Sequence, residues 1–218
     1  DFVDLITLRE TNFGEERRDA DSLQIGGKTL HGVGFRVCQS CGKIQSKRTK
    51  DKQKHDISCR YYGKDVDSDE FENTFLLYRQ LESEAIKLLI PSLNQNESID
   101  TQSFVAAVHL GLKERFGGHL NHLKLSVQHQ PIAGSSLKSQ HVFIYDSVPG
   151  GTGYLKDLTR NETTLVEVLE KAYTALEKCR CADDPALDGC YRCIKAYRFR
   201  FVHNEISRDT AMRQMKRI

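Results

Sequence analysis

Seven cysteines gathered in two short stretches constrain this chain more than any other feature of its sequence. Three lie within the first 60 of its 218 residues, and four lie within 15 residues near the other end. An odd number of thiols cannot be fully paired in disulfides, and the chain opens without a secretory signal. We therefore expect a cytoplasmic protein whose clustered, reduced thiols bind metal.

The C-terminal cluster has the spacing of a four-cysteine zinc site. Cys179 and Cys181 are separated by one residue, and after eight further residues Cys190 and Cys193 form a Cys-x-x-Cys pair. Four thiolates complete a tetrahedral shell around zinc, which predicts a closed, structural site. The alternative is a set of buried free thiols or an oxidised pair.

The N-terminal cluster predicts a second zinc site, made of three cysteines and one histidine. Cys38 and Cys41 are followed by a glycine that permits a tight turn, and thirteen residues, this glycine included, separate Cys41 from His55-x-x-x-Cys59. We expect His55 to be the histidine ligand, with His31 as the weaker candidate. The alternative is a degenerate zinc knuckle that holds no metal.

A basic run lies inside this first zinc loop. The net charge of the chain is only +2, so the position of the charges is more informative than their total. Residues 43–60 hold seven Lys and Arg against two Asp. We expect Lys47, Arg48 and Lys50 to contact nucleic-acid phosphates.

The charge changes sign after the zinc loop, because residues 64–72 are rich in Asp and Glu. This shift predicts a domain boundary. We expect an N-terminal segment with the zinc module over residues 1–65. The main domain would then occupy residues 66–218.

Helical and strand patterns follow one another along the chain, which predicts an α+β fold with a small mixed sheet, packed helices and two structural zinc sites. Apolar periodicity predicts strands at 2–8, 122–129 and 141–146, and helices at 103–112 and 162–178. Residues 74–90 fit either a helix or a strand. The longest apolar runs are far shorter than the roughly 20 residues of a membrane span, so no membrane partner is expected.

A glycine-rich turn follows the strand predicted at 141–146. Asp146 precedes Gly150, Gly151 and Gly153. Glycines allow a backbone to approach a ligand closely, and amides before a helix favour anions, so the turn is a candidate ligand-binding or DNA-binding site. The other interpretations are a structural turn held by Asp146 and a catalytic acid at Asp146.

Cations and aromatic rings interleave from the last cysteine pair of the second zinc cluster onward. Arg192, Arg198 and Arg200 alternate there with four rings: Tyr191, Tyr197, Phe199 and Phe201. Cations for phosphates and rings for base stacking suit single-stranded nucleic acid. The alternative is a basic, solvated segment whose rings pack inward on the zinc site.

Motifs for catalysis are sparse in this sequence. A Walker A loop and an Asp-Glu-x-His box are both absent, so we do not expect these 218 residues to hydrolyse ATP alone. A metal-dependent nuclease or phosphodiesterase centred on Asp146, Glu84 and a histidine is one alternative function. A protein–protein scaffold without DNA affinity is another.

The glycine turn and the second cysteine cluster together resemble a known family. Residues 145–154 read Tyr-Asp-Ser-Val-Pro-Gly-Gly-Thr-Gly-Tyr, and a helix and the Cys-x-Cys and Gly-Cys-Tyr-x-Cys motifs follow. This combination closely resembles the C-terminal zinc-binding domain of mitomycin repair factor A type helicases. The same domain occurs in phage-defence proteins of the DISARM and Druantia systems.

The resemblance extends over roughly residues 75–215 and has functional implications. It implies a bacterial, cytoplasmic protein that works on single-stranded or forked DNA as a non-catalytic accessory of a superfamily 2 helicase. The motor domains would lie in the same chain or in a partner subunit, and we expect the sequence, which begins at Asp1, to be a fragment of something longer. The family's zinc ligands map onto the four C-terminal cysteines. The N-terminal zinc module resembles an extra knuckle of larger defence helicases, which favours phage defence over DNA repair.

Overall fold

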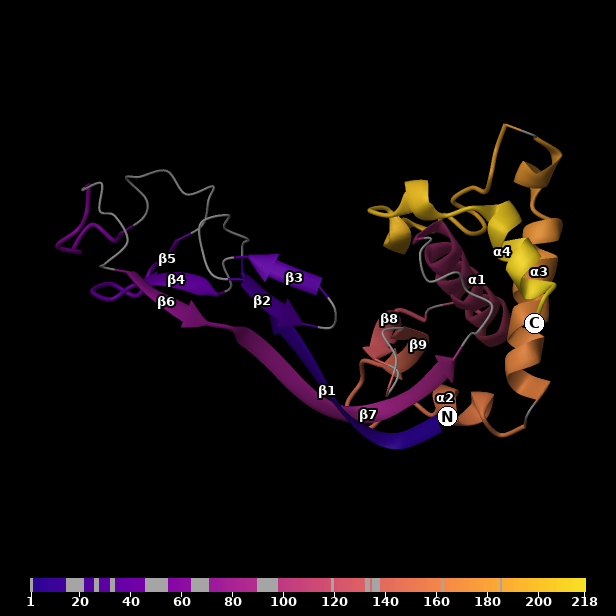
Figure 1. The fold of residues 1–218 in the computed structure, drawn as a ribbon, viewed down its shortest axis with the longest axis horizontal. Coiled ribbons are helices and arrows are strands. Elements are labelled where there is room, and N and C mark those ends of the chain that lie inside the picture. The colour runs from indigo at the N-terminus through magenta and orange to yellow at the C-terminus, as the bar shows by residue number, and fades with distance from the viewer. Residues whose placement is uncertain are drawn as a thin grey trace. The chain divides into compact units, whose positions relative to one another are not determined.

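The computed structural model describes most of the chain and divides it into two compact units. It describes residues 2–14, 22–25, 28–31, 34–45, 55–63, 71–89, 98–118, 120–131, 134, 138–161, 163–184 and 186–218. The larger unit comprises Asp1–Thr7 and Glu82–Ile218, and the smaller comprises Leu8–Leu81 (Figure 1). The chain passes between the units within two long strands. The boundary expected between residues 65 and 66 stays a prediction.

A four-stranded sheet forms the base of the larger unit. Its strands, in the order β1-β7-β9-β8, are β1 (Phe2–Asn12), β7 (Leu77–Leu89), β9 (Lys138–Asp146) and β8 (Leu123–Pro131). Strand β9 pairs antiparallel with both of its neighbours, so that Ile144 lies opposite Ile86 on one side and Leu125 on the other. Because side chains alternate along a strand, this register gathers the aliphatic residues on one face, where they join the main hydrophobic core.

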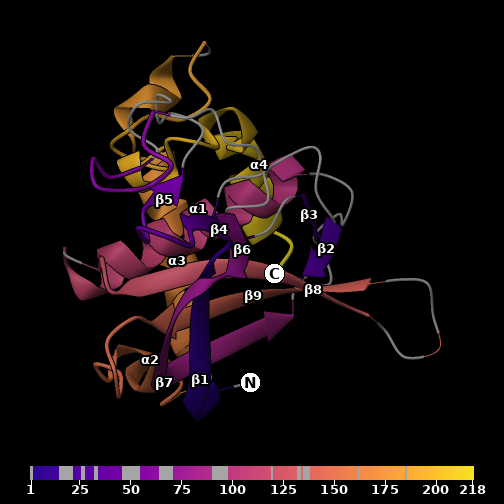
Figure 2. The same ribbon diagram turned by 90° about the vertical axis from the view of Figure 1, so that its left-hand side faces the viewer.

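The helices of the larger unit pack against that core and against one another. They are α1 (Ser98–Phe116), α2 (Tyr154–Leu158), α3 (Thr163–Glu177) and α4 (Arg208–Met215). Thr164, Val168, Ala172 and Leu176 are buried at four-residue spacing along α3. Helix α1 contacts both α3 and α4, and Figure 2 shows α1 and α4 above the strands.

A glycine permits the close approach of α1 and α3. A Cβ atom at Gly111 of α1 would lie only 2.1 Å from the backbone oxygen of Val168 in α3. Any side chain at this position would therefore push the two helices apart.

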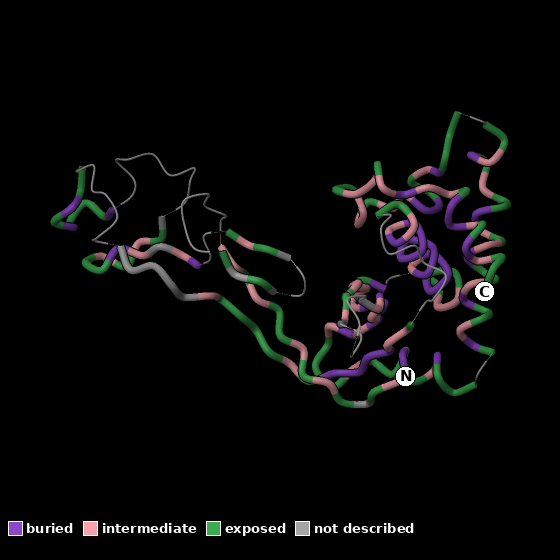
Figure 3. Tube along the Cα trace, in the orientation of Figure 1, coloured by how far each residue is buried: buried purple, intermediate pink, exposed green. Residues whose placement is uncertain are grey.

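The smaller unit is built from short strands. Strands β2 (Ser22–Ile25) and β3 (Lys28–His31) form a two-stranded sheet. Strands β5 (Ile44–Gln45), β4 (Phe35–Cys38) and β6 (Phe71–Phe75) form a three-stranded sheet in that order. Buried residues are concentrated in the larger unit, whereas the described part of the smaller unit holds only a small buried cluster (Figure 3).

The predicted α+β class, with a sheet, packed helices and two clusters that fit zinc, is confirmed. The helix predicted at 162–178 is α3, and the strand predicted at 141–146 is the second half of β9. The ambiguous stretch at 74–90 forms a strand over Leu77–Leu89, because it pairs with β9. Within the described residues, no helix combines the length and the apolar character needed to cross a membrane.

Candidate metal centres and nucleic-acid interface

The four C-terminal cysteines converge at the end of α3. Cys179 follows that helix directly and Cys181 lies in the 3₁₀-helix Arg180–Asp183, while Cys190 and Cys193 belong to one tight turn. All four sulfur atoms lie within 4.8 Å of one another. The end of α3, the 3₁₀-helix and the tight turn therefore bring together all four cysteines that the spacing predicted as zinc ligands.

The sulfur distances fit a zinc ion and exclude a disulfide. Neighbouring sulfurs are 3.4 Å apart for Cys179 and Cys181, and 3.6 Å apart for Cys181 and Cys193. The sulfurs of Cys190 and Cys193 are 3.7 Å apart. Zinc with four sulfurs at about 2.3 Å holds them about 3.8 Å apart, whereas a disulfide needs about 2.05 Å. All seven cysteines of the chain are free thiols, so the alternative of an oxidised pair does not hold.

The turn around Cys190 stabilises thiolate ligands. The amide of Cys190 donates a 3.3 Å hydrogen bond to the sulfur of Cys193. Burial acts to raise the pKa of the Cys190 thiol, but the backbone hydrogen bond at Arg192 and the Cys179 side chain outweigh it and lower that pKa to about 7. A thiolate is the form that binds zinc, so this turn is prepared for metal.

A cation stands next to the C-terminal cluster. The guanidinium of Arg208, which is largely buried, donates to the Asp209 carboxylate at 3.0 Å and lies beside the Cys181 thiol. Burial acts to lower the pKa of Arg208, but Asp209 and Cys181 outweigh it and raise that pKa. Four thiolates around one zinc ion carry a net charge of −2, which this cation partly compensates.

The second cluster brings Cys38, Cys41 and Cys59 together with His55. The sulfur of Cys38 lies 3.8 Å from that of Cys59, and the Nδ1 atom of His55 lies 3.6 Å from Cys59 and 3.9 Å from Cys41. With zinc–nitrogen bonds of about 2.0–2.1 Å, a tetrahedral site predicts similar separations. His31, the weaker candidate, is an exposed residue of β3 outside this group.

Backbone hydrogen bonds prepare this cluster for metal as well. The amide of Ser40 points at the sulfur of Cys38 at 3.4 Å. Burial acts to raise the pKa of the Cys41 thiol, but backbone hydrogen bonds at Asp56 and Lys43 outweigh it and lower that pKa to about 6. Both clusters therefore supply four protein ligands in a buried or half-buried setting and fit one zinc ion each.

Comparison with protein families points to the same domain as the motifs. Residues 104–194 match the family model of the MrfA Zn-binding domain. These residues are therefore similar to an MrfA-type zinc-binding domain. The match includes the glycine turn and all four C-terminal cysteines, and it leaves the N-terminal cluster outside.

Comparison with whole proteins gives one similar solved structure, at low sequence identity. The crystal structure of the DUF1998 helicase MrfA bound to DNA is similar, with 13% sequence identity and a TM-score of 0.44. The similarity covers 93% of this chain and 26% of that one, so the chain spans about a quarter of that helicase. No curated protein matches the chain.

The glycine turn at residues 146–153 is held from within by Asp146. This carboxylate is 0% exposed, and it accepts hydrogen bonds from the amides of Val148 at 2.9 Å and Thr152 at 2.8 Å. The hydroxyl of Thr152 also donates to it. The structure therefore places Asp146 where it organises the turn, with its carboxylate buried.

The three glycines of the turn all adopt positive φ angles. Their φ values are 79° for Gly150, 76° for Gly151 and 83° for Gly153. The amide of Gly150 donates to the backbone oxygen of Glu82, and a Cβ at Gly151 would lie 2.7 Å from the side chain of Glu84. These contacts attach the turn to β7, which explains the need for glycine without a ligand.

The nuclease alternative lacks a metal-binding cluster in the described ranges. Within them, groups of three or more His, Cys, Asp or Glu that could hold a metal occur only at the two zinc sites. Glu84 is buried beside the glycine turn. The described geometry thus favours a structural role for both carboxylates.

The basic, ring-rich segment that begins at Tyr191 has some rings at the surface and one that packs against the core. Tyr191 is 70% exposed, Tyr197 70% and Phe201 84%. The Arg200 guanidinium lies over two of these rings, 4.7 Å from the centroid of Tyr197 and 4.2 Å from that of Phe201. Phe199 instead packs against both hydrophobic clusters of the larger unit. The alternative in which all rings pack inward therefore applies to Phe199 alone.

The arginines expected to contact DNA also differ in how exposed they are. Arg192 and Arg200 are exposed, whereas the half-buried Arg198 donates to the backbone oxygen of Leu123 at 3.1 Å. Arg198 thus attaches this segment to the start of β8. Lys47, Arg48 and Lys50 lie outside the described residues.

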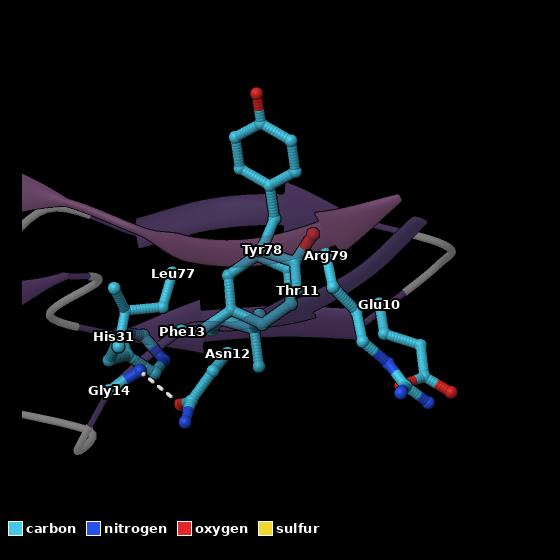
Figure 4. Close-up of a pocket in the computed structure, with 10 residues that line it drawn as sticks. Glu10, Thr11, Asn12, Phe13, Gly14, His31, Leu77, Tyr78 and Arg79 are labelled. Carbon is cyan, nitrogen blue, oxygen red and sulfur yellow. Dashed lines mark hydrogen bonds and ion pairs between the residues drawn. The ribbon is translucent and has the colours of Figure 1, made fainter. Parts of the chain in front are cut away.

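The sequence analysis missed a groove of about 730 Å³ in the smaller unit (Figure 4). Residues of β1, β3 and β7 line it, and at one end the Nε atom of Arg79 lies 2.6 Å from a carboxylate oxygen of Glu10. The lining comes from three separate stretches of the chain, so no local sequence pattern could have revealed it.

Proposed function

We propose that this chain is a zinc-stabilised, non-catalytic accessory region of a bacterial DNA helicase that binds single-stranded or forked DNA beside the motor. The observation that carries the proposal is the array of Tyr197, Arg200 and Phe201, in which one guanidinium lies over two exposed rings. Exposed rings stack on unpaired bases and cations contact phosphates, which suits single-stranded nucleic acid. The match to the MrfA Zn-binding domain supports the helicase setting.

Zinc has a structural role in this proposal, because four protein ligands leave no position open for a catalytic water. The C-terminal site would connect the end of α3 to the turn that precedes the ring array. Tyr191 and Arg192 lie between two of its ligands, so the metal would hold both side chains at the surface. Lys47, Arg48 and Lys50 of the first zinc loop would add phosphate contacts.

The parent protein would act in the bacterial cytoplasm, in phage defence or DNA repair. The N-terminal zinc module favours the defence type, because it resembles an extra knuckle of larger defence helicases. Motor domains in the same chain or in a partner subunit would supply ATP hydrolysis. A nuclease centred on Asp146 has less support, because that side chain is fully buried.

The test is fluorescence anisotropy of the zinc-loaded chain with labelled single-stranded, duplex and forked DNA across a salt series. We expect affinity for single strands to fall steeply as salt rises. The double variant Tyr197→Ala/Phe201→Ala should bind single strands at least about 30-fold more weakly, since each of the two ring–base stacks is worth about 1–3 kcal/mol. The matched control is Val166→Ala/Leu187→Ala, which truncates two other exposed apolar side chains.

Absence of binding by the unmodified chain at low salt would contradict the proposal. A scaffold that docks onto the motor or a partner subunit would then be the better interpretation. Equal losses in the ring variant and in the control would instead remove the ring array from the interface.

A further inference from the structure

The sheet of the larger unit has an outer face opposite to its hydrophobic core. Val142 and Ile144 of β9 point into the core, so the residues that alternate with them point to the other side. We call this the outer face of strands β7, β9 and β8. Its described members are Ala85, Lys87, Leu89, Lys124, Ser126, Gln128, Gln130, Ser139, His141, Phe143 and Tyr145.

Aromatic rings form a row along the central strand of this face. Phe143 and Tyr145 are half-buried and absent from the residues that pack against the core. The rings of His141 and Phe143 are neighbours, with centroids 6.5 Å apart. Two rings with partly exposed surfaces on one strand provide stacking positions about 7 Å apart, given the rise of a strand.

Polar and cationic side chains flank this row on both neighbouring strands. Phe143 lies opposite Lys87 on β7 and Ser126 on β8, and Tyr145 lies opposite Lys124. The ammonium group of Lys87 lies 6.0 Å from the ring centroid of Phe143 and donates to the Gln130 amide oxygen at 2.8 Å. Each partly exposed ring thus has a lysine directly across the ladder.

The charge of the outer face is positive. Its two charged members are Lys87 and Lys124, whereas the nearby carboxylates Glu84 and Asp146 belong to the alternating positions of the core side. A face with cations, rings and amides is complementary to the phosphates and bases of a nucleic acid.

Among the described residues of this face, one buried nitrogen has no hydrogen-bond partner. His141 is 8% exposed, and its Nδ1 atom has no hydrogen-bond partner within the described part of the chain. Burial and the nearby Lys87 both lower the pKa of His141. An unsatisfied buried nitrogen costs free energy unless something supplies the bond, so it points to a ligand at this end of the row.

The outer face is continuous with the ring array after Cys193. Arg198 donates to the backbone of Leu123, at the start of β8, and lies close enough to Tyr145 to interact electrostatically. Residues 197–199 form the 3₁₀-helix that carries Tyr197. A single strand that contacts the array can therefore continue toward Tyr145 without leaving the surface of the larger unit.

We propose that the outer face of β7, β9 and β8 is a second binding surface for single-stranded DNA, where Phe143 and Tyr145 stack on bases and Lys87 and Lys124 contact phosphates. The inference rests on the proposed function, which makes DNA the ligand. Bases must be unstacked to meet rings on a sheet, so the surface selects single strands over duplex. It extends the interface beyond the segment that the sequence indicated.

The decisive variants change the outer face while leaving the core untouched. Lys87→Gln/Lys124→Gln should bind single strands more weakly and lower the slope of log affinity against log salt by about 1.4, because each phosphate that a lysine neutralises contributes about 0.7. Tyr145→Leu should reduce affinity about 5-fold or more, whereas Tyr145→Phe should keep it, because stacking needs the ring and not the hydroxyl. Binding to blunt duplex should stay unchanged in all three.

The matched control for charge is Lys171→Gln/Lys178→Gln, which removes two exposed lysines from α3 and the residue after it. Near-ultraviolet circular dichroism and zinc content establish that each variant is folded. If the unmodified chain does not bind single strands, the proposed function fails and this inference fails with it. If it binds and the Tyr197→Ala/Phe201→Ala variant is weakened, but the outer-face variants behave like the control, only this inference is overturned.

Discussion

The two metal centres share their chemistry but differ in what surrounds them. In the larger unit, Cys181 and Cys193 belong to a hydrophobic cluster to which α1, α3 and α4 all contribute. In the smaller unit, the described cluster consists of Cys38, Cys59 and Tyr61, with one further ligand packed against it. Zinc would thus reinforce an existing core at one site, whereas at the other the ligands themselves form most of the core. The same ion is therefore expected to matter to different degrees for folding.

The largest effect should follow from removing a ligand in the smaller unit. Cys59→Ser should lower the zinc content from two ions to one and unfold the region around the site, because the binding free energy of structural zinc in small modules is about 10–16 kcal/mol. Hydrogen exchange measures the result through the amides of residues 34–45 and 55–63. Ser58→Ala, at the exposed neighbouring position, is the control. Unchanged protection in Cys59→Ser would show that the unit folds without its metal.

A smaller effect should follow from the equivalent change in the larger unit. Cys193→Ser should also remove one zinc ion, but the helices should persist because the main hydrophobic core does not include the cysteines. We expect the free energy of unfolding to fall by about 4 kcal/mol, as for other losses of a metal site. Urea denaturation followed by far-ultraviolet circular dichroism measures it, with Cys59→Ser as the reference. Complete loss of the helical signal would mean that both units depend equally on zinc, and the contrast between them would disappear.

The smallest effect concerns pH and involves the larger unit alone. Burial, followed by the charges of Arg198 and Lys113, lowers the pKa of His109 to about 3. The unfolded chain, with an ordinary histidine pKa of about 6.5, then binds the proton more readily, so stability is lost as pH falls below about 6.5. Between pH 7.5 and 5.5 the unmodified chain should lose about 1 kcal/mol more than His109→Gln.

Comparing the two proteins removes the contribution of the zinc thiolates, which release metal at low pH in both. Urea denaturation at the two pH values supplies the measurement. Identical pH dependence of the unmodified chain and His109→Gln would show that His109 is as free to ionise in the folded state as in the unfolded one.

Local patterns account for the parts of the structure that sequence analysis predicted well. The apolar residues at four-residue spacing predicted α3, and the interpretation of Asp146 as a turn residue agrees with its three hydrogen bonds inside the turn. The number of residues between the four C-terminal cysteines predicted that they form one cluster. In each case the interacting groups lie within about fifteen residues of one another.

Features that depend on distant partners were left open or missed. The stretch 74–90 suits either a helix or a strand until β9 pairs with it, and that pairing also decides which side chains face outward. The sequence preferred His55 to His31 as the histidine ligand, and the arrangement of the cluster confirmed that choice. The segment after Cys193 could not be divided into exposed rings and the half-buried, inward-packed Phe199 without knowing that the two hydrophobic clusters meet there.

The sequence by itself determined that this chain carries two sets of zinc ligands, a glycine turn held by an aspartate, and a segment rich in arginines and rings. Chelation and turn formation are short-range, so residue spacing specifies them. Only the tertiary structure decided that Arg198 anchors that segment to β8 and that Phe143 and Tyr145 share one face with Lys87 and Lys124. Such arrangements depend on strand register, which is set by packing between segments far apart in the chain.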